Sequence, residues 1–211
     1  KYKIKPPSLP FTLNIAVDNL CKNEFDYYRR IQEPHPLFVS KGIDAVPFKH
    51  KNLNEWRSNF KGIRYKSIEN SYDFGGAVDD IWQKKNGELI IVDVKATSRN
   101  NFDWVETFNK YEYPKAYKRQ LEMYQWLFKK NGFEVSPEAY LLYFNGKKNE
   151  EFFNNQLKFD VHLIKLNCSS SWVEPKIIET VNLLRSNIFP NPSPNCEYCN
   201  YLKKRWQLSK N

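Results

Sequence analysis

Residues 75–97 read GGAVDDIWQKKNGELIIVDVKAT, and this stretch decides the fold. The segment 88–97 is nearly continuous in apolar residues and rich in Ile and Val, which predicts a strand covered on both faces. A second strand is predicted from Ala77 to Trp82. The short turn from Lys84 to Gly87 would join the two strands as an antiparallel hairpin.

Three of the charged side chains in the predicted hairpin are candidates for a common site. Asp93 and Lys95 are two residues apart, so in a strand both point to the same face. The hairpin would also bring Asp79 close to Asp93. Two carboxylates in a half-buried site repel each other unless a cation lies between them, and Mg²⁺ prefers carboxylate and water oxygens. The alternative interpretation is a purely structural salt bridge between Asp93 and Lys95.

A metal site of this kind can cleave a phosphodiester. A bound divalent ion lowers the pKa of a water molecule and neutralises the charge that builds on the phosphate. A lysine beside the ion can orient or deprotonate the attacking water. The residues alone therefore predict a phosphodiesterase that depends on Mg²⁺ or Mn²⁺.

The order of these residues resembles the PD-(D/E)xK nuclease superfamily, and more closely its RecB/Cas4-like branch. That branch has G-x-x-D, then an apolar residue with D-x-K, then Q-x-x-x-Y on a following helix. The corresponding elements here are Gly76 to Asp79, Asp93 to Lys95, and Gln120 to Tyr124. The likeness runs from about residue 8 to 202. It implies a restriction-endonuclease-like α/β core with a mixed central β-sheet flanked by helices.

The resemblance implies a role for each matching residue. Asp79, Asp93 and the backbone carbonyl of Val94 would bind the metal, and Lys95 would be the catalytic lysine. Gln120 would support the site or the substrate strand, with Tyr124 behind it. Asp80 is the rival to Asp79, but the spacing from Gly76 favours Asp79, and Asp80 would then face away.

The histidine that this branch often supplies from a helix before the strands has no clear counterpart. The candidates are His50 and His35, and neither lies in the usual G-x-x-x-H setting. His50 is the favoured ligand of the two because it lies nearer the following helix. The alternative is a solvated loop histidine.

The cysteines resemble the branch's iron–sulfur motif only in part. Many members hold a cluster with one N-terminal cysteine and a C-terminal C-x-x-C-x5-C, which Cys21, Cys196 and Cys199 match. The fourth position is Arg205. Because an ordinary [4Fe–4S] centre needs four thiolates, this arginine argues against a cluster. A residual iron–sulfur or zinc site and a metal-free packing role both remain open, with packing favoured.

Composition and charge agree with a nucleic-acid partner. The 211 residues suit one domain, carry a formal net charge of +9, and are 16% aromatic. A basic surface attracts phosphates, and aromatic rings stack on unpaired bases. Arg99, Lys118, Arg119 and Tyr124 are candidate nucleic-acid contacts. Trp104, Tyr111 and Tyr113 are candidate stacking residues. The alternative is a solvated loop with some aromatics packed against the core, and for Tyr124 it is a core aromatic.

The rest of the chain predicts an α/β domain without internal repeats. Helices are expected at residues 12–30, 53–60, 116–131 and 172–186, and strands at 139–144 and 158–166. Residues 31–50 are expected to form a loop or a broken helix, and residues 99–114 a loop. Residues 1–211 would form a single domain. The cysteine-containing tail, residues 190–211, would pack near the N-terminal helix.

Three hypotheses follow for function. The first is a metal-dependent deoxyribonuclease, acting on single strands or ends. The second is a non-cleaving nucleic-acid-binding protein on the same fold, and the third is a structural protein in which Asp93 and Lys95 form a salt bridge. Without a long apolar run, no membrane contact is expected. With four cysteines and no disulfide framework, a cytoplasmic location is expected.

Overall fold

A computed structural model describes residues 12–194 and 196–208 of the chain. The helices are α1 (Thr12–Ile31), α2 (Pro36–Lys41), α3 (Leu53–Trp56), α4 (Trp104–Lys110), α5 (Tyr113–Lys130), α6 (Val173–Arg185) and α7 (Glu197–Leu208). The strands are β1 (Ala45–Pro47), β2 (Ile63–Ser67), β3 (Tyr72–Gly76), β4 (Asp80–Lys84), β5 (Leu89–Thr97), β6 (Val135–Gly146) and β7 (Phe159–Asn167). The predicted α/β class is confirmed.

Five strands form one mixed sheet in the order β1-β4-β5-β6-β7, and β2 and β3 form a separate hairpin. β4 and β5 are antiparallel, with Asp80 opposite Val92 and Gln83 opposite Leu89, so the predicted hairpin is confirmed. β5 and β6 are parallel, because the intervening α4 and α5 return the chain to the same end of the sheet. This is the expected restriction-endonuclease-like core.

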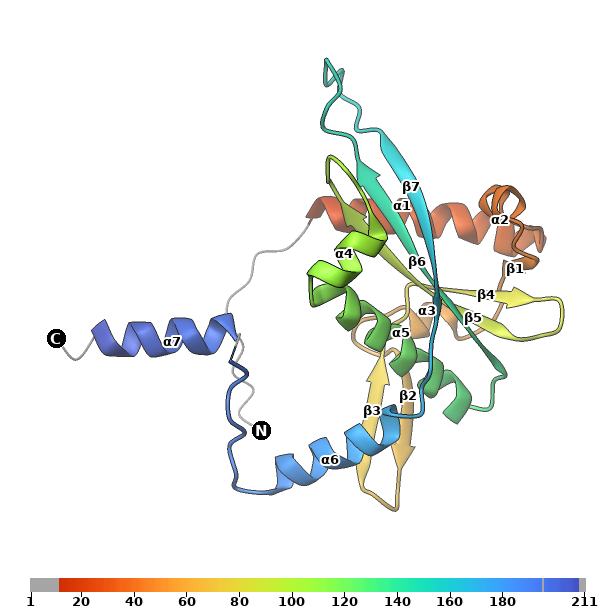
Figure 1. The fold of residues 1–211 in the computed structure, drawn as a ribbon. Coiled ribbons are helices and arrows are strands. Elements are labelled where there is room, and N and C mark those ends of the chain that lie inside the picture. The colour runs from red at the N-terminus through yellow and green to blue at the C-terminus, as the bar shows by residue number, and fades with distance from the viewer. Residues whose placement is uncertain (1–11, 195, 209–211) are drawn as a thin grey trace.

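Helices cover both faces of the sheet (Figure 1). Leu89 and Ile91 of β5 pack in a core that includes Leu121 of α5. Ile90 and Val92 pack in a second core that includes Phe25 of α1. Successive residues of β5 therefore enter opposite cores, which explains its continuous apolar run. The same alternation places Asp93 and Lys95 on the face covered by α5.

The two longest helices end within one residue of their predicted ends at residues 30 and 131, whereas α5 begins at Tyr113, three residues before its predicted start. α1 buries Val17, Cys21, Phe25 and Arg29, which are spaced four residues apart and form one face. α5 has a proline in its first turn and is followed by Gly132, whose φ of +85° ends the helix in a conformation that glycine adopts readily. No helix within the described residues is long and apolar enough to cross a bilayer.

Two predicted boundaries around the hairpin were wrong. The strand expected from residue 77 begins at Asp80, because the Val78 N–H donates to the carbonyl of Trp56 at the end of α3 instead of to a neighbouring strand. The Val78 side chain is buried. Asp79 therefore lies in a bend just before β4. The helix expected at 53–60 is only α3, which ends at Trp56.

The predicted loop at 99–114 contains a helix, and the loop or broken helix predicted at 31–50 contains a short helix and a short strand. Residues 99–114 include α4, whose first turn is capped by the Asp103 carboxylate accepting from the Glu106 N–H at 2.9 Å. Residues 31–50 include α2, capped by His35, and the short strand β1. Both elements are brief, so their apolar periodicity is too short to be recognised in the sequence.

The C-terminal helix α7 stands apart from the sheet and its covering helices (Figure 1). No described residue of α7 is buried. Tyr201, Leu202 and Trp206 are each more than 60% exposed. The packing of residues 190–211 near the N-terminal helix therefore stays a prediction.

Candidate active site

The site forms where β4 and β5 separate. Their pairing ends at Asp80 and Val92, whereas β5 continues to Thr97 along β6 alone. Asp79, in the bend before β4, fills the edge that β4 leaves open. Its Oδ2 accepts a hydrogen bond from the N–H of Val94 at 2.8 Å, which fixes the carboxylate against β5.

Asp93 and Lys95 occupy the same stretch of β5. The Lys95 ammonium contacts Oδ2 of Asp93 and lies 4.5 Å from the ring centre of Tyr117 on α5. The Asp93 side chain is 1% exposed and that of Lys95 is 19% exposed. The structure therefore brings Asp79, Asp93 and Lys95 together, with the lysine on the solvent side of Asp93.

The two carboxyl groups resist ionisation. Burial is the main reason that the pKa of Asp93 is raised to about 7; Lys95 opposes this shift, and the negative charge of Asp79 adds to it. Burial also raises the pKa of Asp79. Oδ2 of Asp93 is buried, and the charged group that contacts it is the Lys95 ammonium. Two adjacent acids with raised pKa values are a donor set that a divalent cation stabilises.

The raised pKa of Asp93 has a measurable consequence in metal-free protein. The folded protein keeps a proton on Asp93 up to about pH 7, whereas the unfolded chain loses it near the ordinary pKa of 3.8. Between these two pH values the folded state therefore binds more protons than the unfolded state. The free energy of unfolding should therefore decrease as the pH rises from 3.8 to about 7, and then level off. Asp93→Asn should flatten this decline.

Urea unfolding in EDTA at several pH values measures this dependence. Asp44→Asn is the matched control, because Asp44 is exposed and pairs with Lys85 at the surface. The control should keep the wild-type decline. An unchanged decline in Asp93→Asn would show that another group causes it.

Lys22 on α1 was not found by sequence reasoning. Its ammonium donates to Asp18 Oδ2 at 2.6 Å and lies 4.0 Å from Oδ1 of Asp79. The two charges Asp18 and Lys22 are four residues apart, a spacing that predicts an ion pair on a helix. Only the packing of α1 beside the sheet shows that this pair faces Asp79.

Asp80 has a structural role, on the opposite side from Asp79. Its Oδ1 accepts from Nη2 of Arg57 at 2.6 Å and is also contacted by Nη2 of Arg29. Both guanidinium groups reach Asp26 as well, and Arg29 donates through Nε to the carbonyl of Phe48 at 2.7 Å. This buried network ties α1, α3 and β4 together. Asp80 is thus unavailable to a metal beside Asp93.

Gln120 and Tyr124 lie behind the acids on α5. The amide of Gln120 donates to the Tyr124 hydroxyl at 2.8 Å. The Tyr124 ring packs on Gly76, where an added Cβ would lie 2.7 Å from Cε1 of the ring. The pKa of Tyr124 is raised to about 12, mainly by burial; the hydrogen bond from Gln120 opposes this shift, and the charges of Asp93 and Asp79 add to it. The glycine and tyrosine of the two sequence motifs therefore meet in space.

The histidines are not brought to the acids. His50 stacks on Trp56 with ring centres 4.3 Å apart, and its Nδ1 accepts from the N–H of Asn52. His35 caps α2 and pairs with Glu24. No group of three or more His, Cys, Asp or Glu side chains that could hold a metal occurs among the described residues. We therefore leave His50 out of the metal site.

The cysteines do not form a common site within the described residues. Cys21 is buried in the core beneath α1, where burial raises the pKa of its thiol. Cys196 and Cys199 lie at the start of α7, where the Cys199 N–H donates to Sγ of Cys196 at 3.4 Å. The metal-free packing of Cys21 near Cys196 and Cys199 stays a prediction.

Basic and aromatic side chains surround the exposed end of Lys95. Arg99 lies 5.1 Å from the ring centre of Tyr111 and 5.6 Å from that of Tyr113. On α5, Arg119 is exposed and Lys118 is half-buried near Glu122. The arginine and its two tyrosines are therefore held as one cluster.

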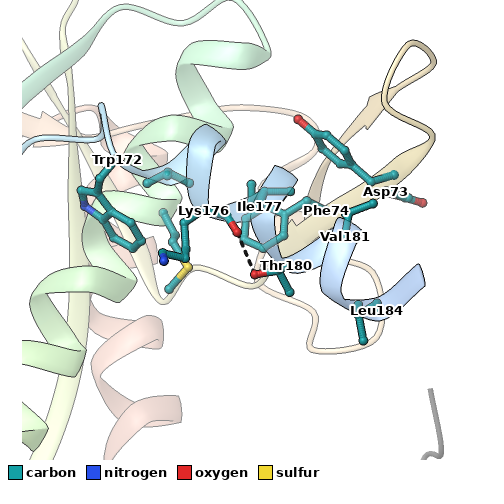
Figure 2. A pocket seen from close by; sticks show the side chains of 11 residues that line it. Asp73, Phe74, Trp172, Lys176, Ile177, Thr180, Val181 and Leu184 are labelled. Atoms are coloured by element: carbon teal, nitrogen blue, oxygen red, sulfur yellow. Dashed lines mark hydrogen bonds between the residues drawn. The ribbon is translucent and has the colours of Figure 1, made fainter. Parts of the chain in front are cut away.

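A cavity of about 260 Å³ lies elsewhere, between α6 and β3. Figure 2 shows the apolar side chains of α6, among them Ile177 and Val181, facing Phe74. The acid on its rim, Asp73, pairs with Arg64 at 3.0 Å. Without paired acids among its lining residues, this cavity cannot perform the metal chemistry expected at Asp79 and Asp93.

Comparison with known proteins agrees with the geometry. Residues 12–203 match the family model described as the PD-(D/E)XK nuclease superfamily. The match covers the hairpin, the acids, Lys95 and α5. No curated protein matches the chain.

Proposed function

The chain belongs to the PD-(D/E)XK nuclease superfamily, and from that premise we propose that it is a divalent-metal-dependent deoxyribonuclease. Members of this superfamily are usually nucleases. We further propose that it belongs to the RecB/Cas4-like branch, on the strength of its G-x-x-D and Q-x-x-x-Y motifs. The observation that carries the proposal is the convergence of Asp79 and Asp93 beside Lys95.

Asp79 and Asp93 would hold Mg²⁺ or Mn²⁺ together with the carbonyl of Val94. The N–H of Val94 points to the open edge of β5, where it meets Asp79. Because the N–H and C=O of one strand residue point to the same edge, its carbonyl is directed there too. When bound, the cation would lower the pKa of a water molecule and neutralise charge on the scissile phosphate.

Lys95 would act on the attacking water or on the phosphate. Its ammonium lies between Asp93 and the Tyr117 ring, which holds it at the rim of the site. From this position it can orient the water and stabilise negative charge on the phosphoryl oxygens. Lys22, 4.0 Å from Asp79, and Gln120, bonded to Tyr124, would act as positioning residues.

The proposed substrate is DNA, drawn to a protein with a formal charge of +9. Arg99, Lys118 and Arg119 lie on elements next to the site and would contact phosphates. Tyr124 is 8% exposed and packs on Gly76, so its contribution would be indirect.

Cleavage of labelled DNA tests the function directly. Purified protein should cut single- or double-stranded DNA in Mn²⁺ or Mg²⁺, and EDTA should abolish cutting. Mn²⁺ should also raise the melting temperature of the wild type, because a ligand bound only to the folded state stabilises it by roughly 2.7 kcal/mol at a hundredfold excess over Kd. Asp93→Asn should lose both effects.

The outcome separates the proposal from its alternative. Asp44→Asn serves again as the matched surface control and should keep both the cutting and the thermal shift. Binding of DNA without cutting in either metal would instead favour a non-cleaving nucleic-acid-binding protein. The absence of a third acidic or histidine ligand in the described part of the chain is the observation that keeps this alternative in view.

A further inference from the structure

A second cavity, of about 240 Å³, opens directly beside Lys95. Its walls are the rings of Phe102, Tyr113, Tyr117 and Tyr143, and its charges are Lys95 and Arg99. Lys95 belongs to both the cavity and the proposed catalytic site. Whatever occupies the cavity therefore lies next to the scissile phosphate of the proposed reaction.

The rings come from three different parts of the fold. Tyr143 is on β6, directly opposite Lys95 of β5, and its ring centre lies 4.9 Å from that of Phe102. Tyr113 and Tyr117 are on the first turns of α5, with ring centres 5.5 Å apart. Flat aromatic walls of this kind bind planar groups by stacking.

Tyr143 lines this cavity, and its hydroxyl is a buried hydrogen-bonding group without a partner among the described residues. The residue is 4% exposed. Leaving a buried hydroxyl unpaired is unfavourable, so a ligand with a matching donor or acceptor would gain by entering. A ligand that is both planar and polar satisfies the walls and the hydroxyl together.

Arg99 supplies the charge that a nucleotide needs. Its guanidinium donates to Thr107 Oγ1 at 3.3 Å, and its backbone N–H donates to Asn145 at 2.8 Å, so the side chain is held over the cavity. Arg99 also lines a neighbouring polar cleft that contains Lys147 and Lys148 as well as Glu150 and Asp160, and Lys147 is paired with Asp160 at 3.0 Å. A phosphate backbone that leaves the cavity on that side would therefore meet Arg99 and Lys148 as its positive partners.

We propose that this cavity binds one unpaired base of the strand being cut, next to the scissile phosphate, and that the substrate is therefore single-stranded DNA. The proposal rests on the proposed nuclease function. A volume of about 240 Å³ accommodates one base and excludes a duplex. A base in a duplex would first have to be unpaired and unstacked, which selects for single strands.

Binding of single strands without divalent metal tests this inference independently of cleavage. A series of short DNA strands would each carry one abasic site, at a different position in each strand. Fluorescence anisotropy in EDTA would measure the affinity of the protein for each strand. One abasic position should weaken binding about tenfold, the size of a lost base–aromatic stack. Tyr113→Leu should weaken binding of the intact strand by a similar factor and leave binding of that abasic strand unchanged.

Two further variants separate recognition of the base from loss of structure. Tyr143→Phe removes only the hydroxyl and should weaken binding of the intact strand while sparing the abasic strand. Tyr27→Leu is the matched control, because Tyr27 is a half-exposed tyrosine with Arg30 lying 5.8 Å over its ring, on α1. It should bind both strands as the wild type does.

The possible outcomes distinguish this inference from the nuclease proposal. Base binding is overturned if the affinity is the same wherever the abasic site lies. It is also overturned if Tyr113→Leu and Tyr143→Phe weaken binding of the intact strand and of the abasic strand equally, even if the enzyme cuts DNA. A position-dependent scan in a wild-type protein that cuts nothing in Mn²⁺ supports base binding and overturns the nuclease proposal. Faster cutting of blunt duplex than of single strands would overturn the assigned substrate.

Discussion

Lys95→Ala is expected to lower the rate of DNA cleavage at saturating Mn²⁺ by about a hundredfold or more while the protein stays folded. A positioned proton-transfer or charge-stabilising group contributes roughly 10²–10⁴ to a rate. The Lys95 side chain is 19% exposed and contacts Asp93 and Tyr117, so its removal leaves the hydrophobic cores intact. Single-turnover cleavage of a labelled strand measures the effect.

The variant also distinguishes catalysis from metal binding. Because Asp79 and Asp93 remain, Mn²⁺ should still raise the melting temperature of Lys95→Ala. Lys176→Ala is the matched control, since Lys176 pairs with Glu179 on the surface of α6, and it should cut at the wild-type rate. Wild-type cleavage by Lys95→Ala would remove Lys95 from the mechanism and leave its contact with Asp93 as a salt bridge.

Asp80→Ala is expected to destabilise the fold severely, by about 3–5 kcal/mol, because it removes one partner from a buried ion network. The Asp80 side chain is 5% exposed, and both Arg29 and Arg57 contact its Oδ1. Without it the two guanidinium groups share only Asp26, which is itself half-exposed. In a protein of this size the loss corresponds to a fall in melting temperature of about 6–20 °C.

The neighbouring acid is the natural control for this prediction. Asp79→Ala removes a carboxylate whose pKa is already raised by burial, so it should cost far less stability while abolishing the thermal shift with Mn²⁺. Thermal and urea unfolding of both variants in EDTA make the comparison. Equal stability of Asp80→Ala and the wild type would show that the network does not hold α1 to β4.

Local patterns were enough to predict the centre of the fold and most of the proposed site. The continuous apolar run of β5 predicts a strand between two layers, since each face needs its own apolar set, and Leu89 to Val92 do alternate between the two cores. A turn of four residues allows little except a hairpin. The neighbourhood of Asp79, Asp93 and Lys95 follows from that pairing and from the two-residue period of a strand.

Other features were not predicted from the sequence, because they depend on contacts between distant segments. The start of β4 was predicted three residues early, since only the packed structure shows Val78 bonded to Trp56. α4 is a seven-residue helix, too short for a periodic signal. His50 was favoured for its place in the sequence, yet in space it stacks on Trp56.

By itself the sequence determined the strand pairing, the face that each residue of β5 presents and the three charged residues at its end, because these follow from short-range backbone geometry. The tertiary structure decided what Asp80 does, because Arg29 of α1 and Arg57, the residue after α3, both reach it. It also decided that Lys22 faces Asp79 and that Tyr143 lines a cavity beside Lys95. Such contacts arise where separate elements pack, and no local spacing specifies them.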